Sequence, residues 1–310
     1  PKKFHVRTSL IPSTNLREIL GRDVYLKLDN TQPSGSFKIR GIGRTCQIGV
    51  KNGAKTLVGA SAGNAGMAMA YSARMLNVPI AIYIPESTSH IMVKKLQAEG
   101  ATVRVTGVDY DEANNEAKTQ QARDPNSFYV HAHNQPTTWQ GHSTLIDEIY
   151  EQLRDEYDDH RRPCCVVTCV GGGGLAMGII IGLRRVGWSD VPVVCMETEG
   201  TDSFNRSVSA GKSVQLDSID SIAASIAVKQ IIPELLDIAF KDEHPIISRV
   251  VSDREAVKAC LRFADDHRIL LEPAVGSVLA AGYTRMALEG CGRRKCDGPV
   301  IFVVCGGNLS

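Results

Sequence analysis

Lys38 is the residue whose sequence surroundings most strongly indicate chemistry. It lies within residues 33–41 (PSGSFKIRG), where small turn-forming residues precede the amine and a helix is expected to begin just after it. The alternative is a solvated surface charge, which is the usual state of a lysine. Small residues let a backbone pass close to a ligand, so this stretch predicts a lysine held beside a bound group.

Two glycine-containing loops further along have the pattern of anion-binding sites. Residues 61–66 (SAGNAG) and 170–175 (VGGGGL) each join an expected strand to an expected helix, and the N–H groups of a helix start can bind an anion. An ordinary turn is the alternative for the first loop. In the second loop, four consecutive glycines cost more backbone entropy than a simple turn requires. The second loop has neither a Walker Lys-Ser/Thr pair nor the acidic residue of a dinucleotide site, so it predicts a phosphate monoester.

Short apolar strands alternate with helices in two series, one on each side of the region around Ala132. This order predicts an α/β fold of parallel βαβ units in two layered domains. The expected strands are 24–28, 56–60, 80–84, 102–105, 128–130, 164–170, 191–196 and 300–304. The expected helices are 15–20, one starting after Lys38, 64–76, 88–98, 111–122, 139–156, 175–186, 203–210, one from the Ser252/Glu255 capping box to about 266, and one starting at Pro273.

Composition restricts the possible partners. With 310 residues and 43% apolar content, the chain can bury a large core, and its net charge of +1 indicates neither a nucleic-acid nor a membrane partner. Its apolar runs are strand-sized and it begins with no signal-peptide pattern, which predicts a cytoplasmic protein acting on a small molecule.

The nine cysteines are an odd number, and most lie in apolar strand-like runs. We expect buried free thiols in a reducing compartment. Cys291 and Cys296 lie close in sequence but lack zinc spacing and a matching pair elsewhere, so a metal role for them is not favoured.

Four motifs in order along the chain resemble the signatures of fold-type II pyridoxal-phosphate enzymes, the tryptophan synthase β-like fold. They are SGSFK at 34–38, SAGN at 61–64, GGGG at 171–174 and CGG at 305–307. The closest resemblance is to the eukaryotic L-serine dehydratase/L-threonine deaminase family. It implies two three-layer parallel-sheet domains with the cofactor, pyridoxal 5'-phosphate, in the cleft between them, and a homodimer. Residues 1–38 and 133–310 would form the large cofactor-binding domain, and residues 39–132 the small substrate-binding domain.

The resemblance also implies a role for individual residues. Lys38 would hold the cofactor as a Schiff base and later remove the substrate Cα proton, and Phe37 would pack against the pyridine ring. The other implied cofactor contacts are Asn64 at the phenolic oxygen, Cys305 at the pyridine nitrogen, and Gly171, Gly172, Gly173, Gly174 and Leu175 at the phosphate. The implied substrate contacts are Ser61, Ala62, Asn64 and Ala65 at the carboxylate, with His133 facing the substrate.

The reaction implied is β-elimination from L-serine or L-threonine, giving pyruvate or 2-oxobutanoate and ammonia. A thiol at the pyridine nitrogen suits elimination, because it leaves the ring a weaker electron sink. Other chemistry on a β-substituted or larger β-hydroxy amino acid, such as β-replacement or racemisation, and a weakly active regulatory cofactor-binding protein are the alternatives. Similar serine racemases carry a hydroxyl residue where this chain has Ala62, and an alanine cannot move a proton.

Two further positions bear on a possible cation site and on the choice of substrate. Glu197 matches the place where family members use a carboxylate to bind a monovalent cation such as K⁺, although Ala227 replaces a glycine in the nearby segment. The alternative for Glu197 is a helix-start or surface glutamate. Residues 131–135 (HAHNQ) replace a Pro-Pro-Phe-Asp-Asp-like loop, and this polar wall would favour a side chain larger or more polar than that of serine. His131 and His133 are also spaced as a metal pair, without an apparent third ligand.

Overall fold

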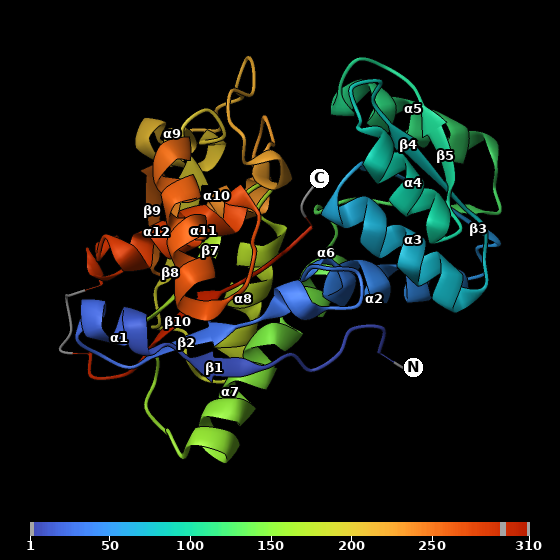
Figure 1. The fold of residues 1–310 in the computed structure, drawn as a ribbon. Coiled ribbons are helices and arrows are strands. Elements are labelled where there is room, and N and C mark those ends of the chain that lie inside the picture. Colours follow the sequence, from blue (N-terminus) through green and yellow to red (C-terminus); the bar gives the residue numbers. More distant parts are fainter. Residues whose placement is uncertain (1–2, 292–295, 309–310) are drawn as a thin grey trace. The chain divides into compact units, whose positions relative to one another are not determined.

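A computed structural model describes residues 3–291 and 296–308 (Figure 1). The chain divides into two compact units. The first unit consists of the described parts of 1–6, 32–142 and 308–310, and the second of 7–31 and 143–307. The sequence analysis placed residues 1–38 and 133–310 in one domain and 39–132 in the other, a division that differs from these units in the N-terminal residues up to 6 and at 32–38, 133–142 and 308.

Packing between two helices explains why these boundary segments join the first unit. Helix α2 (Lys38–Lys51) lies against α6 (Pro136–His142), and the hydroxyl of Thr45 hydrogen-bonds those of Thr137 and Thr138, both at 2.8 Å. A Cβ at Gly41 would lie 2.4 Å from the Thr138 carbonyl oxygen, so the helices approach as closely as glycine allows. The assignment of cofactor and substrate roles to the two domains stays a prediction.

The first unit is built on a four-stranded, fully parallel sheet with strand order β5-β4-β3-β6. The strands are β3 (Thr56–Ala60), β4 (Ile80–Ile84), β5 (Thr102–Val105) and β6 (Ser127–Val130). A core that includes Ile42, Met69 and Leu96 joins the sheet to α2, α3 (Asn64–Leu76) and α4 (His90–Ala98). Helix α5 (Tyr110–Arg123) packs on β3 and β4 through a second cluster that contains Ala117 and Val58.

The second unit contains a six-stranded sheet with strand order β1-β2-β10-β7-β8-β9. The strands are β1 (Leu10–Pro12), β2 (Val24–Lys27), β7 (Cys165–Cys169), β8 (Val193–Thr198), β9 (Ile246–Val251) and β10 (Val300–Val303). The helices are α1 (Thr14–Leu20), α7 (Thr144–Tyr157), α8 (Gly174–Arg185), α9 (Ser203–Ala210), α10 (Pro233–Phe240), α11 (Asp253–His267) and α12 (Pro273–Tyr283). The short 3₁₀ helices of this unit are η1 (Asp29–Thr31), η2 (Ala224–Ile226) and η3 (Met286–Leu288).

The sheet of the second unit is parallel, as predicted, except at one edge. Strand β1 pairs antiparallel with β2. It is three residues long and ends in Pro12, and an edge strand tolerates a proline because its outer side needs no ladder hydrogen bond. The other edge strand, β9, and helix α10 were not predicted either.

The predicted helix over 139–156 is two helices, α6 and α7, which meet at Ser143. Arg185 donates to both the hydroxyl of Ser143, at 2.9 Å, and its carbonyl oxygen, at 3.0 Å. Other predicted helices are confirmed: α3 and α9 have the expected bounds, and Ser252 with Glu255 forms the capping box that opens α11. No helix in the described parts of the chain is both long and apolar enough to cross a membrane.

One cysteine prediction is wrong, because Cys164 and Cys296 form a disulfide. Cys164 immediately precedes β7, and Cys296 lies shortly before β10, its parallel neighbour. The register pairs Val300 with Cys165, so the two cysteines meet where both strands begin. The other seven cysteines are free thiols, five of them buried.

Candidate cofactor and substrate site

The turn before Lys38 is fixed by Gly35 and Asn308. Gly35 has φ of +78°, which glycine adopts readily, and a Cβ there would lie 2.5 Å from Oδ1 of Asn308. The Asn308 amide donates to the carbonyl oxygen of Ser34 at 3.0 Å and to Oδ1 of Asn64 at 2.6 Å. Asn308 therefore joins the turn in front of Lys38 to the start of α3.

Lys38 is the first residue of α2, whereas the sequence predicted that the helix begins just after it. Its Nζ donates to the carbonyl oxygen of Ala132 at 2.9 Å and lies 5.3 Å from the centre of the Phe37 ring. The Phe37 ring in turn packs on His142, with ring centres 4.8 Å apart. The structure thus brings the amine of Lys38 to the 131–135 loop.

The loop over 61–65 joins β3 to α3 as expected. No side chain caps the start of α3 at Gly63, and the Ser61 hydroxyl accepts the Gly63 N–H at 3.3 Å. A Cβ at Gly66 would lie 2.1 Å from the carbonyl oxygen of Ser61, which explains why that position is a glycine. Asn64 and Ala65 are buried, and an uncapped helix start of this kind can bind a carboxylate.

The 131–135 loop is held by its own side chains. Nδ1 of His131 accepts the N–H groups of His133, at 3.2 Å, and Asn134, at 3.0 Å, while Gln135 Oε1 accepts the His131 N–H at 3.1 Å. A ring nitrogen that accepts carries no proton. Burial, with Lys118 and Lys38 nearby, lowers the pKa of His131 to about 4.

His133 lies against His131, with ring centres 4.7 Å apart. Burial, together with His131 and Lys38, holds the pKa of His133 well below its usual value. Both imidazoles are therefore uncharged at neutral pH. The described residues contain no group of three or more His, Cys, Asp or Glu able to hold a metal ion, so nothing adds a third ligand to this pair.

The four-glycine loop connects β7 to α8 in the second unit. Gly173 has φ of +93°, and a Cβ there would come within 3.1 Å of side chains of Ile231, Ile232 and Leu235. A Cβ at Gly171 would lie 3.0 Å from Cα of Ile226. These glycines are needed because other segments pack closely against the loop. No side chain caps α8, whose first turn, with Leu175, can therefore bind an anion.

Cys305 follows β10 and is 2% exposed. Its Sγ lies 3.3 Å from that of Cys169. The hydrogen bond with Cys169, burial, and the carboxylates of Glu272 and Asp29 raise the pKa of Cys305 well above its ordinary value. The side chain is thus a neutral thiol, the protonation state on which its predicted role depends.

Glu197 lies in β8 and is fully buried. Its two carboxylate oxygens accept the N–H groups of Phe204, at 2.9 Å, and Asn205, at 2.8 Å, in the first turn of α9. Burial raises the pKa of Glu197 to about 8. The structure gives this carboxylate a helix-start role, and a cation at Glu197 stays a prediction.

Two buried hydroxyls test whether the first unit fits a polar ligand. The hydroxyl oxygens of Ser34 and Ser36, on the turn before Lys38, have no hydrogen-bond partner among the described residues. Leaving a buried hydroxyl unpaired costs about 1–3 kcal/mol. Because the two lie on the turn that leads into Lys38, they fit residues that receive a polar ligand, as a phosphate-bearing aldehyde would be.

Some site residues were not assigned a role from the sequence. These are Asn308, the carbonyl of Ala132, the hydroxyls of Ser34 and Ser36, and Cys169 beside Cys305. The signal available for Asn308 was its place directly after the Gly306-Gly307 pair, and for the serines their position within the lysine motif. Nothing in the sequence marked Ala132 or Cys169.

A lysine at a helix start, uncapped glycine-rich loops and two α/β units define the class of cofactor-dependent enzymes that bind a phosphate-bearing aldehyde. Residues 2–306 match the family model of pyridoxal-phosphate dependent enzymes, and the chain belongs to this family. The prediction made from the four motifs is therefore confirmed.

Known relatives match along nearly the whole chain. The L-serine dehydratase/L-threonine deaminase of Mus musculus is 43% identical over 310 residues, covering 99% of this chain and 92% of that protein. The Homo sapiens protein of the same name is 44% identical over 311 residues, with the same coverage. The crystal structure of a fungal L-serine ammonia-lyase from Rhizomucor miehei superposes with a TM-score of 0.89 at 33% identity, covering 99% of this chain and 95% of that one. The fold is that of fold-type II enzymes, as predicted.

Proposed function

We propose that this protein removes water and ammonia from L-serine or L-threonine to give pyruvate or 2-oxobutanoate. The observation that carries the proposal is the placement of Lys38, whose amine is held 2.9 Å from the Ala132 carbonyl oxygen in a loop with two uncharged histidines. The names of the relatives, L-serine dehydratase/L-threonine deaminase and L-serine ammonia-lyase, support the same reaction.

Lys38 acts as the base in this proposal. Bound pyridoxal phosphate would supply an electron sink for the carbanion formed at the substrate Cα. Lys38 Nζ takes the Cα proton, and the Ala132 carbonyl oxygen orients the amine by accepting a hydrogen bond from it. The neutral rings of His131 and His133 add no further positive charge to the loop around the amine.

The remaining site residues bind and orient. Gly171, Gly172, Gly173, Gly174 and Leu175 would hold the cofactor phosphate at the uncapped start of α8. Cys305 would meet the pyridine nitrogen as a neutral thiol, and Phe37 and Asn64 would contact the ring and its phenolic oxygen. The start of α3, with Ser61, Ala62, Asn64 and Ala65, would bind the substrate carboxylate, with His133 facing the side chain.

Racemisation or β-replacement at the same site is the second candidate. Ala62 carries no proton-transferring group, so a second acid–base residue for racemisation is missing at that position. Chiral analysis of recovered serine tests racemisation, and mass analysis for a thioether product after adding a thiol tests β-replacement.

We also infer a monovalent cation at Glu197, a homodimer and a cytoplasmic location. The buried carboxyl group of Glu197 supports the first, and the resemblance to the dehydratase family supports the others. Comparing turnover in K⁺ and in tetramethylammonium salts tests the cation. Light scattering of the purified protein and fractionation of the source cells test the remaining two.

The deciding experiment measures 2-oxo acid release from serine, threonine and larger β-hydroxy amino acids. Lys38→Ala should lose at least about 10²–10⁴-fold in kcat, because a positioned base contributes that much. Lys51→Ala is the matched control, since Lys51 is an exposed lysine at the end of the same helix. Full turnover by Lys38→Ala would overturn the assignment, and failure of the wild type on every hydroxyamino acid would overturn the proposed function.

A further inference from the structure

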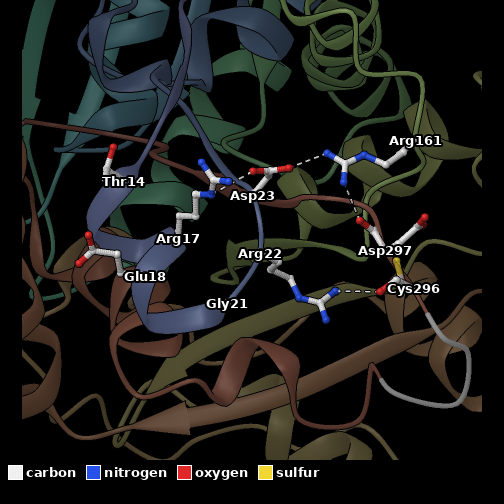
Figure 2. A pocket seen from close by; sticks show the side chains of 9 residues that line it. All are labelled: Thr14, Arg17, Glu18, Gly21, Arg22, Asp23, Arg161, Cys296 and Asp297. Atoms are coloured by element: carbon white, nitrogen blue, oxygen red, sulfur yellow. Dashed lines mark hydrogen bonds and ion pairs between the residues drawn. The ribbon is translucent and has the colours of Figure 1, made fainter.

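A pocket of about 620 Å³ lies in the second unit, away from the predicted cofactor loops. Its walls include Arg17 and Glu18 of α1, the turn residues Arg22 and Asp23, and Cys296 (Figure 2). These residues lie where β2 and β10 begin, whereas the four-glycine loop and Cys305 follow the opposite ends of β7 and β10. The two places therefore lie at opposite ends of the strands of one sheet.

Arg22 is directed at the Cys164–Cys296 disulfide. Its Nη1 donates to Sγ of Cys164 at 2.6 Å and to the carbonyl oxygen of Cys296 at 3.1 Å. A neutral disulfide sulfur is a weak acceptor, whereas a thiolate next to a guanidinium is stabilised by charge. Arg22 is thus placed where negative charge would develop if the disulfide broke and left Cys164 as the thiolate.

The sulfur of Cys296 is more accessible than that of Cys164, as attack on Cys296 requires. Cys164 is 3% exposed, while Cys296 is only partly buried and lines the pocket. An attacking thiolate in the pocket therefore reaches Cys296, and Cys164 becomes the leaving group. A leaving thiol with a lowered pKa departs faster, which is the effect expected of the Arg22 contact.

The pocket walls carry charges of both signs. Arg17 and Arg161 both pair with Asp23, at 3.3 Å and 2.6 Å, and Glu18 and Asp297 add further carboxylates. Figure 2 shows these ion pairs around the space beside Cys296. Such walls complement a small thiol that itself carries ammonium and carboxylate groups, and the volume is in the range of small-molecule sites.

We propose that the Cys164–Cys296 disulfide is a reversible exchange site for a small zwitterionic thiol such as glutathione, with Arg22 stabilising the Cys164 thiolate. The small thiolate attacks Sγ of Cys296, the Cys164–Cys296 bond breaks, and a mixed disulfide forms on Cys296 while Cys164 leaves as a thiolate. A second small thiol then attacks the mixed disulfide, releasing the Cys296 thiolate and the small-molecule disulfide. The small-molecule disulfide drives the reverse sequence, so electrons and atoms balance in both directions.

The neighbouring thiols Cys165 and Cys291 are the competing site. Both donate to the carbonyl oxygen of Ala287, at 3.4 Å and 3.2 Å. Their mutual hydrogen bond, with Arg249 and Arg22 nearby, lowers the pKa of Cys291. Mapping which cysteines respond therefore distinguishes the proposal from reaction at this second pair.

The test uses the full chain loaded with its cofactor and equilibrated in mixtures of reduced and oxidised glutathione. Alkylation and peptide mass spectrometry then give the reduced fraction of each cysteine. We expect Cys164 and Cys296 to titrate together, with a glutathione adduct on Cys296 at intermediate ratios. Arg22→Gln should favour the disulfide, so that the equilibrium constant for its reduction by glutathione falls about tenfold and its midpoint potential by about 30 mV. Arg22→Lys should recover most of this change.

Arg17→Gln is the matched control, because Arg17 lines the same pocket but contacts Asp23 rather than sulfur. It should leave the midpoint unchanged and slow reduction by glutathione more than reduction by neutral 2-mercaptoethanol. If Arg22→Gln does not fold, Arg22→Lys and the comparison of the two thiols on the wild type test the same idea. A disulfide that no glutathione ratio reduces, an adduct on Cys291 instead of Cys296, or equal midpoints for wild type and Arg22→Gln would each overturn the proposal.

Discussion

Replacing Gly35 with alanine tests whether the turn before Lys38 holds the amine in place. Gly35 has φ of +78°, a left-handed conformation that costs alanine about 1–2 kcal/mol. The new Cβ would also lie 2.5 Å from Oδ1 of Asn308, so this amide must move away and give up its hydrogen bonds to Ser34 and Asn64. Each bond contributes about 1 kcal/mol. We therefore expect the free energy of unfolding to fall by about 3–4 kcal/mol.

The turn also sets the position of the amine, so turnover should fall as well. A displacement of about 1 Å at a catalytic group can cost about 100-fold in rate, and we expect a loss of this order in kcat for serine. Urea unfolding followed by circular dichroism gives the stability, and 2-oxo acid release gives the rate.

Gly53→Ala is the matched control for this prediction. Gly53 has φ of +104°, but nothing lies within 4 Å of the position its Cβ would take, so only the backbone cost of about 1–2 kcal/mol applies. In an Asn308→Ala background the collision at Gly35 is absent, and Gly35→Ala should then cost no more than the control. Equal stability and equal turnover for Gly35→Ala and Gly53→Ala in the wild-type background would refute the reasoning.

Three further predictions follow from buried ionisable groups. The pKa of His131 in the folded protein, about 4, lies below its ordinary 6.5, so the stability from the neutral ring is present above pH 6.5 and is lost as the pH falls toward 4. His131 should account for about 2 kcal/mol of the unfolding free energy lost between pH 7 and pH 5, as measured by urea unfolding. The loss in His131→Phe, which cannot titrate at this position, should be smaller by that amount, and an unchanged pH slope contradicts this. Lys27 is fully buried and pairs with Glu148 at 2.7 Å, so Lys27→Met should cost about 3–5 kcal/mol in the same assay. Adding Glu148→Leu should recover most of that loss, and a double variant as unstable as the single one argues against the ion pair. Above pH 8, where Glu197 is ionised, Glu197→Gln should weaken the start of α9 by about 1–3 kcal/mol, because a carboxamide has one acceptor for two N–H groups. The substitution should also remove any K⁺ dependence of kcat, and a K⁺ response like that of the wild type would exclude Glu197 as the ligand.

Elements with a strong local signal were predictable from the sequence. Helix α3 has the predicted bounds because Asn77 ends it with a left-handed cap, and the Ser252/Glu255 box opens α11. Strand β9 was missed because it is an edge strand that is mostly half-buried, so its Ile-Ile-Ser-Arg-Val-Val sequence mixes apolar and polar residues. The break between α6 and α7 falls at Ser143, which accepts hydrogen bonds from Arg185, 42 residues away, and no local pattern reports such a contact.

In the candidate site, the local backbone was predictable where a short motif specifies it, as at Lys38, Asn64 and the four-glycine loop. It was not predictable where the interaction joins distant segments. The contact from Lys38 to Ala132 spans 94 residues, and that from Asn308 to Asn64 spans 244. The Cys164–Cys296 disulfide is similar, because it depends on the register between β7 and β10. Motifs therefore indicated candidate residues, whose roles stay predictions, but not the contacts that hold them.

The polar 131–135 loop gives weaker support for an unusual substrate than its sequence suggested. The Nδ1 atom of His131 is occupied by two backbone N–H groups, and both polar atoms of the Gln135 amide contact backbone, at His131 and Tyr129. These side chains hold the loop in shape, so their polarity need not face a substrate. Two polar side chains of the loop remain, those of His133 and Asn134. We expect His133, whose carbonyl oxygen is fixed by the Trp139 ring N–H at 2.8 Å, to set side-chain preference. His133→Phe should therefore change the ratio of kcat/KM for threonine over serine, whereas His131→Phe should change stability with little effect on that ratio. A shift in the ratio for His131→Phe alone would show that loop shape selects the substrate instead.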